Sequence, residues 1–480
     1  MFDETTAHPT PEALARALPP GFVIGTATAA AQIEGASRAG NRSPSVWDRF
    51  AAQPGRILDG SDTSVTADHY HRYREDVALM RDLGADAYRF SFSWTRLQPH
   101  GRGPLDPAGS DFYDRLLDEL QEAGVSPFAT ISHWDLPEEY AHGWLDRETA
   151  LRLGDLAHLL GERFGDRVDA WITINEPATV TLNGYALGLH PPGESLLFDA
   201  LPTVHHQLLG HGLAVQALRA AGVPGRVGIA NVHSPVSPAA DTDEDHAMAA
   251  LFDLVHNRVY ADPVLLGRYP EAPGFLGDAL AAFDAVPADD LAQIHQPLDF
   301  YGLNYYMPTL VAAGAGSGES PDGTSQAMAG LPFRLEAFEG VPTTGFGWPI
   351  KPDGFVRALG EMQERYGEAL PPVYITENGA SFPDEVGPDG TVDDRERIAF
   401  LGDHLRAAIG AVAPGGPAEG LDLRGLFVWS LIDNWEWAAG FTQRFGLVHV
   451  DFTTGDRTPK ASYHWLRELL AARRADRLSA

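Results

Sequence analysis

The sequence predicts an α/β fold, a single (β/α)8 barrel of the TIM type with elaborated βα loops. Eight short apolar runs typical of strands are spread over the 480 residues, and segments with helical periodicity lie between them. A doubly wound sheet usually has fewer strands. No Ser/Gly-rich linker marks a shift in composition. We therefore expect one domain over residues 1–480, with an N-terminal extension at 1–20 and the barrel at about 21–472.

The predicted elements alternate along the chain in the order that a barrel requires. Helical patterns occupy residues 67–83, 111–123, 151–164, 203–221 and 394–412, and a closing helix is expected at 460–472. The predicted strands are residues 22–28, 87–92, 126–132, 170–175, 226–231, 300–305, 373–376 and 425–429.

The longest stretch without a clear pattern, residues 307–350, is rich in Gly, Pro, Ser and Thr and follows the sixth strand. Loops of this length in compact domains are often functional. We expect it to be an irregular βα loop over the catalytic face.

Composition excludes several classes of function. The chain has 35 basic and 66 acidic residues, a formal charge of −31, which argues against nucleic acid or an anionic membrane as partner. Because it contains no cysteine, disulfides, thiolate catalysis and cysteine metal sites are excluded. No apolar run has the length of a membrane span, and residues 1–20 do not resemble a secretion signal. We expect a cytoplasmic protein with a neutral small-molecule substrate; whether it forms a homo-oligomer is left open.

Two glutamates directly end two of the predicted strands. The fourth strand runs into Asn175-Glu176-Pro177 and the seventh into Glu377-Asn378-Gly379. Active sites of these barrels lie at the carboxyl ends of the strands, so the two carboxyls can face each other across the mouth. A single such glutamate is most often a solvated loop residue, but two matched ones favour glycoside hydrolysis, which needs a carboxyl pair. A separation of ~5–5.5 Å gives retention and ~6.5–9.5 Å gives inversion, and the sequence leaves that distance open.

These two segments resemble the catalytic signatures of family 1 glycoside hydrolases. The resemblance covers residues from about 21 to 465 and includes further motifs in order on successive strands. These motifs are residues 25–35 (GTATAAAQIEG), 88–91 (YRFS), 133–137 (HWDLP), 304–306 (NYY) and 429–437 (WSLIDNWEW).

The resemblance implies a role for each catalytic residue. Glu377 is the nucleophile that forms a covalent glycosyl-enzyme, and Glu176 is the general acid and then the general base. Arg89 would lie beside the nucleophile, and the hydroxyl of Tyr306 would donate to it. Asn175 would hold the sugar 2-hydroxyl. We further expect the charge of Glu377 to raise the pKa of Glu176 in the free enzyme.

A sugar-binding set is also implied, with Trp429 as the stacking platform. From its place on the long loop at 307–350, Trp348 is expected to form a wall of the +1 site. Taken alone, His133 would be read as a buried structural histidine and the tryptophans as core. Glu436 is more informative, because a carboxylate between Trp435 and Trp437 is costly to bury unless a partner such as a sugar diol binds it. The full set is Gln32, His133, Trp134, Asn304, Trp348, Trp429, Glu436, Trp437 and Phe445.

The predicted function is a retaining β-glucosidase acting on β-glucosides, cellobiose and short cello-oligosaccharides. A broader β-glycosidase that takes galactosides or fucosides, a transglycosylase on the same intermediate, and an inactive sugar-binding protein are the alternatives. The last is disfavoured because both glutamates are present. Relatives that act on 6-phosphosugars carry serine in place of Glu436 and a nearby lysine, whereas residues 438–444 contain no lysine. No metal or organic cofactor is expected, since zinc-helix, EF-hand and dinucleotide motifs are all missing.

Overall fold

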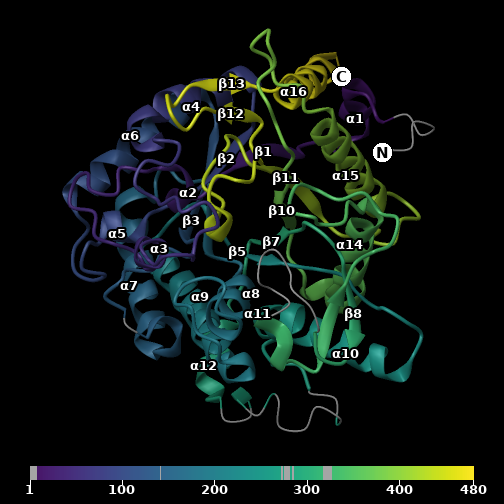
Figure 1. Ribbon diagram of the computed structural model, residues 1–480. Coiled ribbons are helices and arrows are strands. Elements are labelled where there is room, and N and C mark those ends of the chain that lie inside the picture. The colour runs from purple at the N-terminus through teal and green to yellow at the C-terminus, as the bar shows by residue number, and fades with distance from the viewer. Residues whose placement is uncertain are drawn as a thin grey trace.

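The computed structural model describes residues 8–140, 142–271, 274, 280, 282, 283, 286–316 and 327–479. Its centre is a closed barrel of eight parallel strands (Figure 1), which confirms the predicted fold class. The strands follow one another around the barrel in the order β1-β11-β10-β7-β5-β4-β3-β2. Their bounds are β1 Val23–Ala27, β2 Ala87–Ser91, β3 Ser126–Ser132, β4 Ala170–Asn175, β5 Arg226–Val232, β7 Phe300–Asn304, β10 Val373–Asn378 and β11 Leu423–Trp429. All eight predicted strands are confirmed.

Helices form the outer ring around the strands (Figure 1). The six predicted helices are present as α4 His69–Leu83, α6 Pro107–Ala123, α7 Arg147–Phe164, α9 Pro202–Ala220, α15 Arg395–Val412 and α16 Ala461–Ser479. Local chemistry explains their ends. In α6, Asp106 accepts hydrogen bonds from the amides of Ala108 and Gly109, Pro107 occupies the first turn, and Gly124 ends the helix at φ 70°.

Several helices were not predicted from the sequence. The connection between β5 and β7 contains α10 Asp243–Asp253, α11 Val259–Leu266 and α12 Ala288–Ile294, and α14 Pro352–Tyr366 precedes β10. Short helices lie within the βα loops: α2 Ala30–Ile33, α3 Val46–Ala51, α5 Trp94–Leu97 and α8 Pro177–Thr179.

The expectation that residues 307–350 are irregular is partly wrong. Within them, β8 Thr309–Ala313 pairs antiparallel with β9 Phe333–Glu336. A further strand, β6 Val236–Pro238, pairs with β8 to complete a three-stranded sheet outside the barrel. These strands are only three to five residues long, and the surrounding Gly, Pro and Ser hide their pattern in the sequence. Residues 317–326 of this stretch lie outside the described residues.

Aromatic side chains fill the interior of the barrel. The ring of Phe128 lies 4.8 Å from that of Phe427 and 5.6 Å from that of Tyr374, which in turn is 5.5 Å from Phe300. The guanidinium of Arg226, at the start of β5, lies over two of these rings. The barrel is therefore a packed core rather than a pore, and the predicted catalytic glutamates lie at the carboxyl ends of the strands.

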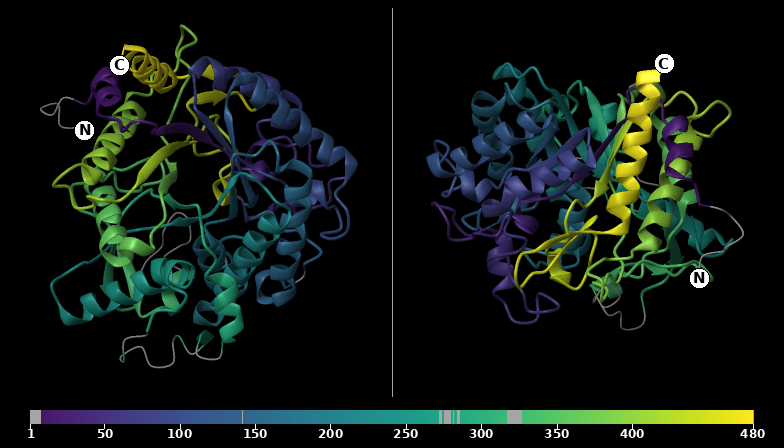
Figure 2. Two further views of the ribbon diagram at one scale, coloured as in Figure 1. Left: turned by 180° about the vertical axis from the view of Figure 1, so that it is seen from behind. Right: turned by 90° about the horizontal axis from the view of Figure 1, so that it is seen from above.

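The ends of the described chain lie together. Helix α1 Pro11–Ala17, within the predicted N-terminal extension, packs beside α16 (Figures 1 and 2). A small antiparallel pair, β12 Val448–Val450 and β13 Arg457–Pro459, leads into α16. Within the described ranges, every helix is too short or too polar to span a bilayer. The single-domain organisation stays a prediction.

Candidate active site

Glu176 and Glu377 lie at the carboxyl ends of β4 and β10, which are separated in the barrel by β5 and β7. The pairing of both strands with their neighbours shifts register close to these residues. Glu176 has φ 44°, a left-handed conformation, and Pro177 begins α8 immediately after it. This sharp change of direction turns the carboxyl out of the strand and into the barrel mouth. Both residues are almost fully buried, at 5% and 3% exposure.

Glu377 is held by one cation and one hydroxyl. Arg89, at 0% exposure, forms an ion pair with its Oε1, and the hydroxyl of Tyr306 donates a 2.6 Å hydrogen bond to Oε2. Burial and then the charge of Glu377 raise the pKa of Tyr306 well above its usual value, so its hydroxyl keeps its proton. Both carboxylate oxygens thus accept from fixed donors, an arrangement suited to an anionic nucleophile.

Glu176 has a different environment. The amide of Asn304 donates to Oε1 at 2.7 Å, and the hydroxyl of Thr179 donates to Oε2 at 2.7 Å. Burial raises the pKa of Glu176 to about 7, with the negative charge of Glu377 as the second cause. The expected effect of Glu377 is therefore present, but desolvation contributes more. Near neutral pH this group can give up a proton and take one back.

Asn175 connects the two sides of the site. Its Oδ1 accepts from Arg89 at 2.6 Å and from Asn304 at 3.0 Å, which identifies this atom as the oxygen. Its Nδ2 must then donate to Nε2 of His133, 3.0 Å away. Burial, together with the charge of Arg89, lowers the pKa of His133 well below its usual value, so the ring is neutral and carries its proton on Nδ1. That Nδ1 is buried without a partner in the described part of the chain, which leaves a free donor for a ligand.

A second polar pair joins α2 to the loop after β11. Nε2 of Gln32 donates to Oε2 of Glu436 at 3.1 Å and to Oδ1 of Asn434 at 3.0 Å. Oε1 of Gln32 is buried and has no partner among the described residues. Burial, and next the charge of Glu377, raises the pKa of Glu436 to about 8. An amide oxygen and a carboxyl that lack full partners can together take a pair of vicinal hydroxyls.

Aromatic rings surround these polar groups. Trp437 lies at the centre of one group, 4.5 Å from Trp134 and 4.7 Å from Trp47, and its ring is nearly parallel to that of His133. Trp429 lies 6.1 Å from His133. On the other side, Trp348 lies 5.4 Å from Tyr306 and 6.1 Å from Phe445, so it borders the catalytic tyrosine.

Comparison with known proteins agrees with this arrangement. The model of glycosyl hydrolase family 1 matches residues 14–475. A β-glucosidase A from Acetivibrio thermocellus is 40% identical over 94% of this chain and 98% of its own length. A bifunctional β-D-glucosidase/β-D-fucosidase from Bifidobacterium breve is also 40% identical, over 94% and 98%. The crystal structure of a psychrophilic β-glucosidase from Micrococcus antarcticus superposes with a TM-score of 0.88 at 42% identity and covers 98% of this chain and 100% of its own.

The chain belongs to glycosyl hydrolase family 1. It is therefore an O-glycosyl hydrolase, as predicted. Nowhere in the described ranges do three or more histidine, aspartate or glutamate side chains gather in a way that could hold a metal ion.

The structure brings every predicted site residue of this family 1 enzyme to the same end of the barrel or to the loops over it. Two further residues of the site were not predicted from the sequence. Thr179 is on the short α8 turn, three residues after Glu176, and that spacing on a helical turn was a usable signal. Trp47 comes from α3, far from any motif, and no local pattern points to its contact with Trp437. Trp435, by contrast, is fully buried against Trp47 and donates its indole N–H to Ser61.

Proposed function

We propose that this family 1 enzyme is a retaining β-glucosidase that releases terminal non-reducing β-D-glucosyl residues from β-glucosides and short cello-oligosaccharides. The observation that carries the proposal is the contrast between two buried glutamates at the barrel mouth. One is paired with a guanidinium, and the other has its pKa raised to about 7.

In the first step, the Glu377 carboxylate attacks the anomeric carbon while the bond to the aglycone oxygen breaks. That oxygen takes the proton of Glu176 and leaves as an alcohol. The product is a glycosyl ester on Glu377. Arg89 and Tyr306 hold the attacking carboxylate in place before this step.

In the second step, Glu176 is a carboxylate and takes a proton from water as the water oxygen attacks the same carbon. The ester bond breaks, the sugar leaves with its β configuration restored, and both glutamates return to their starting states. Esterification removes the negative charge of Glu377, which is one of the two causes that raise the pKa of Glu176. The geometry therefore favours Glu176 as an acid before the ester forms and as a base afterwards.

Recognition of the sugar is assigned to the remaining polar and aromatic groups. Oε1 of Gln32 supplies an unpartnered acceptor, the carboxyl of Glu436 lies beside it, and Nδ1 of His133 supplies a donor. Asn175 contacts the 2-hydroxyl, and Trp429 and Trp437 pack against the ring. Trp134, Asn304, Trp348 and Phe445 complete the surroundings of this site.

The relatives support a glucose-type substrate, since the proteins from Acetivibrio thermocellus and Micrococcus antarcticus are named β-glucosidases. One relative of equal identity is bifunctional towards β-D-fucosides. A β-fucosidase side activity is therefore the second candidate function. A cytoplasmic location and action on cellobiose and short cello-oligosaccharides stay predictions.

The decisive experiment measures release of p-nitrophenol from its β-glucoside by the wild type, by Glu377→Gly, and by Glu385→Gly as a control at an exposed glutamate. We expect turnover by the wild type and the control, and its loss in Glu377→Gly. Azide should restore release from Glu377→Gly and yield the α-glycosyl azide, because it replaces the missing carboxylate on the same face. A wild type that is inert on glucoside, galactoside and fucoside would overturn the proposal.

A further inference from the structure

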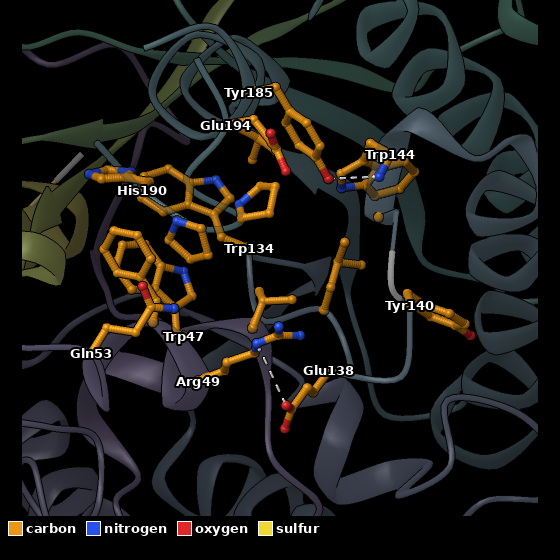
Figure 3. A pocket seen from close by; sticks show the side chains of 17 residues that line it. Trp47, Arg49, Gln53, Trp134, Glu138, Tyr140, Trp144, Tyr185, His190 and Glu194 are labelled. Atoms are coloured by element: carbon orange, nitrogen blue, oxygen red, sulfur yellow. Dashed lines mark hydrogen bonds and ion pairs between the residues drawn. The ribbon is translucent and has the colours of Figure 1, made fainter. Parts of the chain in front are cut away.

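A cavity of about 150 Å³ lies beside the catalytic site, between α3, the loop after β3 and the segment after α8. Figure 3 shows Trp47, Trp134 and His190 on one side of it, with Trp144 and Tyr185 across from them. Among the lining residues that the structure describes, Trp134 alone belongs to the sugar-binding set assigned above. The cavity therefore shares one wall residue with the sugar-binding set, and neither catalytic carboxyl lines it.

The cavity has the lining of a carbohydrate site. Its walls are aromatic, from Trp47, Phe50, Trp134, Trp144 and Tyr185. Polar side chains stand at its edge, and all of them reach solvent: Arg49, Gln53, Glu138 and Glu194. An apolar wall with a polar rim matches a pyranose, whose ring faces are C–H groups and whose edge is a ring of hydroxyls. The volume accommodates one six-membered ring and is well below the ~300–1,000 Å³ of sites for larger ligands.

Charge argues for a neutral ligand. Arg49 and Glu138 are 3.9 Å apart and are 64% and 39% exposed, so this loose pair can turn to hydroxyls at little cost. Glu194 adds a second negative charge, and burial lowers the pKa of His190 to about 3, which leaves that ring neutral. An anionic ligand would therefore meet net negative charge.

Trp134 connects the cavity to the reaction centre. Its ring lies 4.5 Å from Trp437, and its indole N–H donates to the carbonyl of Asn175, the residue before Glu176, at 2.9 Å. Its φ is 74°, a left-handed conformation that bulky residues rarely adopt and that is found mostly where function requires it. The fold thus holds this indole as the wall between the cavity and the catalytic site.

We propose that this cavity is a second carbohydrate site, which binds a single neutral pyranose ring against Trp134. The ring comes either from free glucose or from the distal unit of a cello-oligosaccharide whose terminal glucose occupies the catalytic site. The inference rests on the proposed function in two respects: the cello-oligosaccharide source assumes that substrate class, and the test blocks Glu377 with a glucosyl group.

In the test, Glu377 is first esterified with a 2-deoxy-2-fluoroglucosyl group, and mass spectrometry verifies one group per chain. Glucose is then titrated into the blocked enzyme by calorimetry. We expect one glucose per chain, bound at least about tenfold more weakly by the Gln53→Ala/Glu138→Gln double variant. Glu139→Gln, an exposed neighbour that does not line the cavity, is the matched control and should bind as the wild type does.

A second variant tests the cavity without changing the polar residues at its edge. Val46 lines the cavity and is half-buried, so Val46→Phe places a ring inside it and should abolish binding. Because Gln53→Ala/Glu138→Gln changes only solvent-accessible groups, it should fold and can be measured even when Val46→Phe does not fold.

The two sources of the ring give different results. Free glucose is the ligand when the blocked wild type binds it. The distal unit is the ligand when the blocked enzyme binds no glucose but the double variant raises KM for cellotriose and leaves that for cellobiose unchanged. The proposal is overturned when the double variant changes neither glucose binding by the blocked enzyme nor KM for cellotriose. Failure of the labelling itself contradicts the proposed function instead. The cavity is then tested by comparing glucose binding by the unlabelled wild type, the double variant and Glu139→Gln, since only the double variant changes the cavity.

Discussion

Nζ of Lys460, at 0% exposure, lies 2.7 Å from Oδ1 of Asp433 beneath the loop that carries Glu436. Asp433 also accepts from Arg444 at 2.9 Å and from the amide of Gly446 at 2.9 Å. Lys460 further pairs with Asp384, which binds Arg397 at 2.7 Å. This buried network ties the loops after β10 and β11 to the start of α16. Removing one of its cations would leave buried carboxylates without a full set of partners.

Lys460→Met should lower the free energy of unfolding by about 3–5 kcal/mol, because it leaves two buried aspartates without one of their cations. The only other lysine is the matched control. Lys351 is 24% exposed and pairs with Asp353, which is 73% exposed, so Lys351→Met should cost less than about 1 kcal/mol. Urea unfolding of both variants measures the difference. Equal losses would contradict the assigned role of the network.

The pH dependence of catalysis should follow Glu176. With an aryl glucoside whose leaving group needs a proton, kcat/KM should fall above about pH 7, because the acid form of Glu176 is lost as the pH rises through its raised pKa. Glu176→Gln, assayed with a dinitrophenyl glucoside that leaves without a proton, should form the glycosyl-enzyme with no decline near pH 7. If the decline above about pH 7 persists in this variant, it is caused by the titration of a group other than Glu176.

The sequence predicted the barrel and the catalytic pair because each rests on local signals. Apolar runs mark the strands, and Glu176 and Glu377 directly end two of them. The raised pKa of Glu176 was predicted from the charge of Glu377, but its larger cause is burial, which depends on side chains brought together by the fold. The same limit explains why Trp47 was missed, because its neighbour Trp437 is distant in sequence. The strands β8 and β9 were missed because they are short and Gly, Pro and Ser surround them.

Tyr306→Phe should reduce kcat/KM roughly 10- to 150-fold, because a hydrogen bond to a charged group is worth about 1.5–3 kcal/mol. The variant removes the 2.6 Å donor to Glu377 but leaves Arg89 in place. The neighbouring residue offers a matched control. Tyr305 donates to the carbonyl of Lys351 instead, so Tyr305→Phe should retain most activity. Steady-state kinetics on one glucoside compares the two variants. Equal effects would show that the Tyr306 hydroxyl has no catalytic role.

Glu436→Gln should weaken sugar binding yet stabilise the fold at alkaline pH. The pKa of Glu436 is raised from 4.5 to about 8, so the native state holds this proton more tightly than the unfolded chain does. Its contribution to stability is then complete below pH 4.5 and is lost as the pH rises to about 8. A neutral glutamine removes that loss. The melting temperature of Glu436→Gln relative to wild type should therefore be higher at pH 8.5 than at pH 5, while KM for the glucoside rises. Glu385→Gln, at an exposed site, is the control and should show no such pH-dependent difference. If Glu436→Gln loses stability equally at both pH values, the Glu436 carboxyl is ionised in the native enzyme and has its full set of hydrogen-bond partners.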